Sequence, residues 1–178
     1  MTWPNGETQE WHRLGEEARL AHAAVDAAFR AGVRTADPAR YEALLRDFHV
    51  RTAAALPSSR PGFLQALAAG NGCAIDSAVA FLEADPWFFR SGYEKQALIR
   101  HLKRASLSTH QRERLAHVVL AAIDGRDRVE FRHFCRLACS IWSDLLDEEV
   151  AKRMQSTDVG IRRRATWVAE ATCFSGKA

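Results

Sequence analysis

The sequence has few of the residues that favour β-strands. Val, Ile and Thr together number 23, whereas Ala alone numbers 31. Because Ala is the strongest helix former and β-branched residues favour strands, this composition argues against a β-rich fold and predicts an all-α protein. The 178 residues, 47% hydrophobic and 26% charged, also exclude an intrinsically disordered chain and predict one domain over residues 1–178.

Long apolar runs are absent as well. The longest stretch without a charged residue, residues 61–75, contains Gln, Asn and three Gly, which excludes a helix that spans a bilayer. Residues 1–10 have no signal-peptide core. The four cysteines show no CxxC spacing, so we expect free thiols in a reducing compartment and a cytoplasmic location.

Local signatures of common enzymes are also lacking. The sequence contains no GxSxG, P-loop, GxGxxG or HExxH motif, so no catalytic residue and no cofactor is assigned. Cys135 and Cys139 stand four residues apart near His133, and they could hold a metal only if another helix supplied ligands. Because both lie on an apolar stripe, burial as small hydrophobic residues is favoured and no metal is assigned.

The N-terminal part reads as a pair of long helices over residues 1–56. Trp11, Val25 and Phe29 recur at helical spacing together with His22, which predicts a helix over residues 7–31 with these side chains on its buried face. Asp37 followed by Pro38 is typical of an N-cap and first helical turn, and the second helix should extend to residue 56.

Residues 57–86 are rich in Pro and Gly and predict a loop with short helices, and Asp85-Pro86 marks the end of the last of them. Trp87, Phe88 and Phe89 follow directly. Three consecutive aromatic residues cannot all face one side of a helix, so at least one is a lid over a neighbouring core or an exposed anchor for a partner. Of these two alternatives, packing over a neighbouring core is favoured.

Residues 87–178 have the most regular pattern, with apolar stripes separated by short breaks. Ser108 and Gln111 match the capping box that begins a helix. The whole chain should form about eight or nine helices. Because the connections are short, consecutive helices should lie antiparallel as hairpins.

Two segments of this region align with each other. Phe131-Arg132-x-x-Cys135-x-x-Ala138 matches Ile161-Arg162-x-x-Ala165-x-x-Val168 at an offset of 30 residues, a typical helical-repeat period. The segment 145–171, with Asp158, Ile161 and Arg162 at the start of its second helix, resembles one unit of the HEAT repeat family. The resemblance implies a short right-handed α-solenoid of antiparallel hairpins over residues 87–178. It also implies a protein-interaction or scaffold module without enzymatic activity.

Basic residues are concentrated in the C-terminal half. Residues 1–86 hold 8 basic and 11 acidic side chains, and residues 87–178 hold 17 and 11. One cationic face for phosphates or an acidic protein partner could include His101, His110, His117 and His133 and the residues Arg100, Lys103, Arg104, Arg112, Arg114, Arg126, Arg128, Arg132 and Arg136. The alternative is a solvated helix surface on which interleaved acidic residues pair with the arginines.

Arg163, Arg164 and Trp167 form a second candidate site, which we expect on the outer face of the last helix. An aromatic ring beside two guanidinium groups can stack on a base or bind a phosphate. This stretch also resembles the Arg-Arg segment of HEAT-like alkylpurine DNA glycosylases, which implies a contact between Arg163 and the DNA backbone. The alternative function is therefore nucleic-acid binding or repair. A third possibility is a homo-oligomer that buries Trp87 or Phe89.

Overall fold

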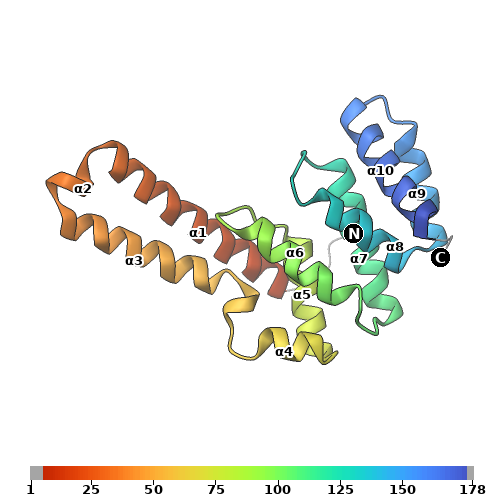
Figure 1. Cartoon of the computed structure of the whole chain (residues 1–178), viewed down its shortest axis with the longest axis horizontal. Coiled ribbons are helices and arrows are strands. Elements are labelled where there is room, and N and C mark those ends of the chain that lie inside the picture. The colour runs from red at the N-terminus through yellow and green to blue at the C-terminus, as the bar shows by residue number, and fades with distance from the viewer. Residues whose placement is uncertain (1–5, 176–178) are drawn as a thin grey trace.

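The computed structural model describes residues 6–175, and the side chains of residues 6–172. Residues 1–5 of the segment that lacks a signal-peptide core, and the side chain of Cys173, therefore lie outside the description. The described residues form ten α-helices and one short 3-10 helix, η1 (Pro57–Ser59), and contain no strand (Figure 1). The all-α prediction is confirmed. The expected eight or nine helices become ten because the linker after the first helix forms α2 (Val33–Ala36).

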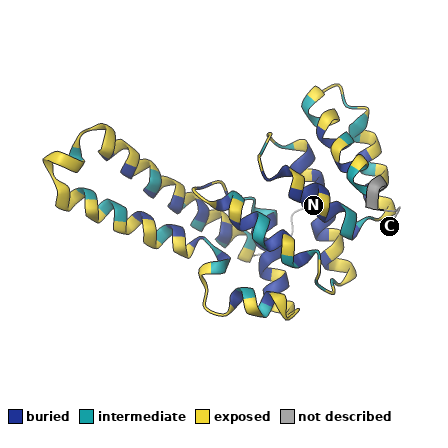
Figure 2. Ribbon diagram, viewed as in Figure 1, coloured by how far each residue is buried: buried dark blue, intermediate teal, exposed yellow. Residues whose placement is uncertain are grey.

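Helices α1 (Gly6–Arg30) and α3 (Pro38–Ala54) lie side by side and form an elongated arm (Figure 1). Asp37 caps α3 by accepting a hydrogen bond from the backbone N–H of Arg40, as predicted. Only a small apolar cluster around Val25 and Phe48 joins the outer part of the arm, which is largely exposed in Figure 2. The expected burial of Phe29 is wrong, because its side chain lies on the solvent side of α1.

The inner end of the arm packs against α5 (Gly72–Ala84), with the short helix α4 (Phe63–Ala68) beside it. Trp11 of α1 is completely buried and meets Phe81 of α5 edge to face, with ring centroids 5.5 Å apart. This aromatic pair joins the arm to the main apolar core, which continues through α5 to α10 (Figure 2). No helix in the described part of the chain has both the length and the apolarity needed to cross a membrane.

Six helices complete the chain in three consecutive pairs. The pairs are α5 with α6 (Ser91–Leu102), α7 (Thr109–Asp124) with α8 (Phe131–Ile141), and α9 (Asp144–Met154) with α10 (Val159–Ser175). Helix α7 contacts both α5 and α9, and α8 contacts both α6 and α10, so corresponding helices of successive pairs are neighbours. The capping box at Ser108 and Gln111 is present at the start of α7, as predicted.

The aromatic segment between α5 and α6 is divided between core and surface. Phe88 is buried, whereas Trp87 is 55% and Phe89 52% exposed. Phe89 still packs against His22 of α1 and Phe48 of α3. Core packing therefore holds for Phe88, Phe89 covers a neighbouring cluster, and Trp87 is an exposed aromatic side chain.

Candidate functional site: a basic and aromatic surface

Helices α6 and α8 bring four predicted binding residues together. Arg100 lies in α6 and Lys103 is the C-cap residue of that helix, whereas Arg132 and Arg136 lie in α8. The spacing places each pair on one face of its helix. All four positive charges act on His133. Burial is the main cause that lowers the pKa of His133, and these four cations lower it further. We call these four residues and the adjacent exposed Arg104 the α6–α8 basic face.

Eleven of the 24 described Lys and Arg side chains pair with a carboxylate, whereas the members of this face have no acidic partner. Within the described side chains, no carboxylate lies within ion-pair distance of any of the five. By contrast, Arg13, Arg19 and Arg51 on the arm each pair with a glutamate or aspartate. The face therefore carries uncompensated positive charge, which attracts anionic partners.

Other arginines of the predicted cationic surface are buried instead. Arg114 makes two hydrogen bonds to Glu83, and Arg128 makes two to Asp85. His133 is also buried, and its lowered pKa favours the neutral form. The prediction that these three belong to an exposed cationic face is wrong, because tertiary packing turns them inward to meet acidic or apolar groups.

The second predicted site, on α10, is only partly exposed. Arg164 is 5% exposed, and it donates hydrogen bonds to the carbonyl of Ile123 (2.7 Å) and to Asp127 (2.6 Å). Its expected place on the outer face is therefore wrong. Arg163 is exposed but also binds Asp127, and both arginines lower the pKa of that carboxylate. Most of the positive charge of the pair is thus balanced locally.

Trp167 remains available on the same helix. It is 45% exposed, its ring leans against Phe131 with centroids 6.0 Å apart, and the Arg163 guanidinium lies 5.2 Å from its centre. A hollow of about 400 Å³ beside Trp167 is also lined by Arg132 and Arg136. This exposed indole therefore borders the α6–α8 basic face.

The loop between α7 and α8 extends this surface towards Trp87. Val129 lines the hollow beside Trp167 and also a pocket of about 260 Å³ that is lined by Trp87 and Tyr93. Arg126 from the same loop stacks over Trp87, with its guanidinium carbon 3.5 Å from the ring centre. Three exposed aromatic side chains, Trp87, Tyr93 and Trp167, therefore line two neighbouring hollows that share Val129, and we call these three residues the aromatic strip.

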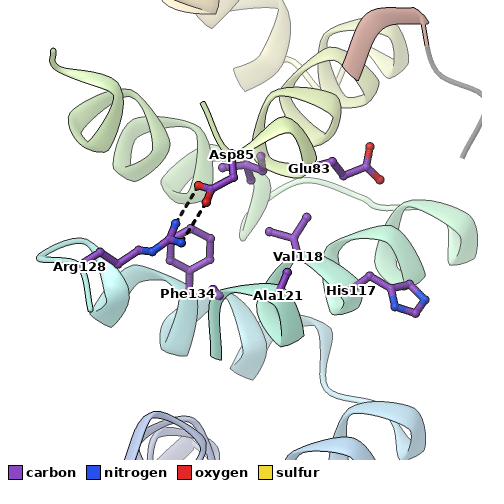
Figure 3. Close-up of a pocket in the computed structure, with 9 residues that line it drawn as sticks. Glu83, Asp85, His117, Val118, Ala121, Arg128 and Phe134 are labelled. Carbon is purple, nitrogen blue, oxygen red and sulfur yellow. Dashed lines mark hydrogen bonds and ion pairs between the residues drawn. The ribbon is translucent and has the colours of Figure 1, made fainter. Parts of the chain in front are cut away.

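A largely buried ionic cluster that the sequence patterns do not predict borders the strip, because its member Arg128 also lines the hollow beside Trp167. Asp85 binds Lys95 (2.6 Å). It also binds both terminal nitrogens of Arg128 (2.7 and 2.9 Å), as Figure 3 shows. Burial alone would raise the pKa of Asp85, but its bonds to Arg128 and Lys95 outweigh that effect and lower it. Asp85 was interpreted only as a helix end, and no local pattern connects it to residue 128.

Figure 3 also shows the cavity of about 200 Å³ that lies between α5, α7 and α8 beside this cluster. Its carboxylates are already engaged, Asp85 with Arg128 and Lys95, and Glu83 with Arg114. Carboxylates that are paired within the protein offer little to a ligand. We therefore assign Glu83 and Asp85 a structural role.

The described residues contain no cluster of His, Cys, Asp or Glu suited to a metal ion. Cys135 is buried, and burial raises the pKa of its thiol to about 11, so it is protonated at neutral pH. Cys139, four residues along α8, is half-buried and donates to backbone carbonyls. Both cysteines thus lie on the packed side of α8.

The connected features are a basic face without acidic partners, an aromatic strip beside it and a largely buried ionic cluster that borders the strip. Comparison of the chain with known protein families, with curated proteins and with solved structures finds no match. The chemistry of this surface is therefore the basis for a functional assignment.

Proposed function

We propose that this protein is a non-enzymatic binding module that holds single-stranded nucleic acid on the α6–α8 basic face and the aromatic strip. The observation that carries the proposal is the group of five cationic side chains without acidic partners, of which Arg132 and Arg136 line the hollow beside exposed Trp167. Phosphates pair with arginine and lysine, and unpaired bases stack on aromatic rings with little regard to sequence. The basic face provides contacts for phosphates, and Trp167 beside it provides a ring on which a base can stack.

An acidic protein partner is the second candidate, and the arrangement of the helices is compatible with it. Three helix pairs in which corresponding helices touch support a HEAT-like solenoid, an architecture that presents helical surfaces to other proteins. Phe131 and Ile161, the aligned residues of the two similar segments, lie at or near the starts of α8 and α10, the second helices of successive pairs. The proposed solenoid is compatible with either partner.

The glycosylase-like alternative has less support. The resemblance assigns a DNA-backbone contact to Arg163, yet this side chain is bound to Asp127. A phosphate would have to compete with that carboxylate. Nucleic-acid binding is therefore proposed without a catalytic step.

The test is the salt dependence of binding to a fluorescent oligothymidine, measured by anisotropy. For single strands, the slope of log affinity against log salt is about −0.7 for each phosphate that is neutralised, so five cations predict a slope of about −3.5. The variant Arg132→Ala/Arg136→Ala should reduce the magnitude of the slope by about 1.4 and weaken binding at low salt.

The matched control is Arg13→Ala/Arg19→Ala, which removes the same charge from two exposed, paired arginines of α1. It should leave the slope unchanged. Absence of oligonucleotide binding at low salt, or equal effects of the two double variants, would refute nucleic-acid binding at this face. Binding of polyglutamate instead, with sensitivity to Arg132 and Arg136, would favour the acidic protein partner.

A further inference from the structure

Glu130 differs from the other buried carboxylates of the described chain. Its side chain belongs to a residue that is only 5% exposed, it accepts no hydrogen bond, and its Oε1 is fully buried. Glu94, which is equally buried, accepts hydrogen bonds from the backbone N–H and the hydroxyl of Ser58. Because an unpaired buried acceptor is costly, a ligand in the pocket that donates a hydrogen bond to this carboxylate would be favoured.

Glu130 lines the pocket of about 260 Å³ that is also lined by Trp87 and Tyr93. Its carboxylate lies directly over Gly92 in the first turn of α6, where the Cβ of any larger residue would come within 3.2 Å of Oε2. With a larger residue at position 92 the Glu130 carboxylate would have to shift by a few tenths of an ångström. The pocket is smaller than the roughly 300–1,000 Å³ of typical drug-sized sites, and it therefore suits a flat group about the size of one base.

The backbone around this pocket is held in an uncommon conformation. Asp85 and Arg90, which flank the segment that carries Trp87, both have positive φ (43° and 71°) although neither is glycine. Such residues are unfavourable unless the surrounding structure holds them, and they are frequent at ligand sites. The buried bonds of Asp85 to Lys95 and Arg128 supply this restraint.

Charges near the pocket identify the kind of donor. Arg90 lines it, and Arg126 stacks on the Trp87 wall, so a cationic ligand would meet two positive charges at the rim. The buried Lys95 and Arg128 lie close by and are already bound to Asp85. A neutral donor on a planar ring avoids the repulsion at the rim and can stack on Trp87 or Tyr93.

We infer that this pocket binds one base of the bound strand, a base with an exocyclic amino group that donates a hydrogen bond to Glu130. Cytosine, adenine and guanine carry such a group, whereas thymine and uracil present carbonyl oxygens that the carboxylate repels. Arg90 and Arg126 lie where they can contact the phosphates on either side. The inference rests on the proposed function and adds a base preference to it.

The experiment compares oligothymidine with the same strand carrying one central cytosine. Wild-type protein should bind the cytosine strand about tenfold more tightly, which corresponds to one good base contact. The Glu130→Gln variant should lower the preference to less than about twofold and keep the salt slope, since the basic face is intact. Equal affinity of the wild type for both strands, or an unchanged preference in the variant, would overturn the inference. Glu130 would then serve only as a counter-charge to Lys95.

A second measurement keeps the test valid if Glu130→Gln folds poorly. Trp87→Ala and Tyr93→Ala alter exposed side chains and should weaken binding of the cytosine strand at least fivefold, whereas Phe29→Ala, an exposed aromatic at the far end of α1, should have no effect. Equal effects of all three variants would exclude base binding in this pocket.

Titration with CMP and UMP separates the two proposals. Preference for CMP that is lost in the Trp87 and Glu130 variants supports the base pocket even if no oligonucleotide binds, and only the proposed strand binding then fails. Oligonucleotide binding without any base preference would support the proposed strand binding and overturn the base pocket.

Discussion

Replacement of Asp85 by Asn tests the buried ionic cluster most directly. Asn has nearly the same shape, and it tolerates the positive φ of this position better than other non-glycine residues do. The substitution therefore removes the charge with little change in the backbone. Lys95, which is 0% exposed, and Arg128 would then be two buried cations without a counter-charge from residue 85.

The expected loss follows from the burial of the three groups. Breaking a buried ion pair by removing one partner costs about 3–5 kcal/mol. Because 39% of the Asp85 side chain is exposed, solvent screens part of this effect, and we expect a loss of about 2–3 kcal/mol. For a chain of this length that loss lowers the melting temperature by about 4–12 °C.

Urea unfolding of the wild type and Asp85→Asn at neutral pH measures the loss. The double variant Asp85→Asn/Lys95→Met removes the surplus cation and should recover about 1–2 kcal/mol. A loss below about 0.5 kcal/mol for Asp85→Asn would refute the reasoning, because it would equal that of an ordinary surface substitution.

The same cluster predicts the effect of pH. The pKa of Asp85 is lower in the folded chain than in the unfolded one, so the unfolded chain takes up the proton first as the pH falls. The stabilisation is complete above the ordinary value of 3.8 and is lost as the pH falls through the folded-state pKa. The difference between the wild type and Asp85→Asn should therefore shrink below about pH 4.

Three further predictions concern local packing, a helix cap and a buried histidine. Gly15→Ala should destabilise the protein by about 1–3 kcal/mol in urea unfolding, since the new Cβ would lie 2.5 Å from Pro86 Cβ. Gly72→Ala places its Cβ in open space and should change the stability by less than about 0.5 kcal/mol. Similar losses for the two variants would contradict the close contact at Gly15. Ser108→Ala should cost about 1 kcal/mol in the same assay through loss of the capping box, and no loss would count against it. The pKa of His133 is lowered in the folded chain, so the unfolded chain binds the proton first as the pH falls. The melting temperature of the wild type should therefore fall below about pH 6.5, and that of His133→Gln should lack this contribution. Identical pH profiles would show that His133 does not cause the pH dependence.

Features that depend on neighbouring residues were predictable. The caps at Asp37 and Ser108 satisfy backbone N–H groups three residues away, so the local sequence specifies them. The approximate spans of most helices follow from apolar spacing in the same way. Helix α2 escaped prediction because a four-residue turn has no periodicity to detect.

The binding surface was predictable only in part. Arg132 and Arg136 are one turn apart on an amphipathic helix, and their exposure follows from that helix alone. Arg128 and Arg164 have the same chemistry, yet they are buried because Asp85 and Asp127 come close to them in the folded chain. These partners are 43 and 37 residues away, and no short-range pattern reports such a distance.

The amino-acid sequence by itself determined that the chain is helical, approximately where most helices begin and end, and that its positive charge lies in the C-terminal half. These properties arise from backbone propensities, caps and composition, which act over a few residues. The tertiary structure decided which arginines remain without partners, which aromatic residues stay exposed, and that Glu130 lies buried without a hydrogen bond beside Trp87 and Tyr93. Those properties depend on contacts between distant helices, and such contacts form only when the apolar faces of the helices pack together.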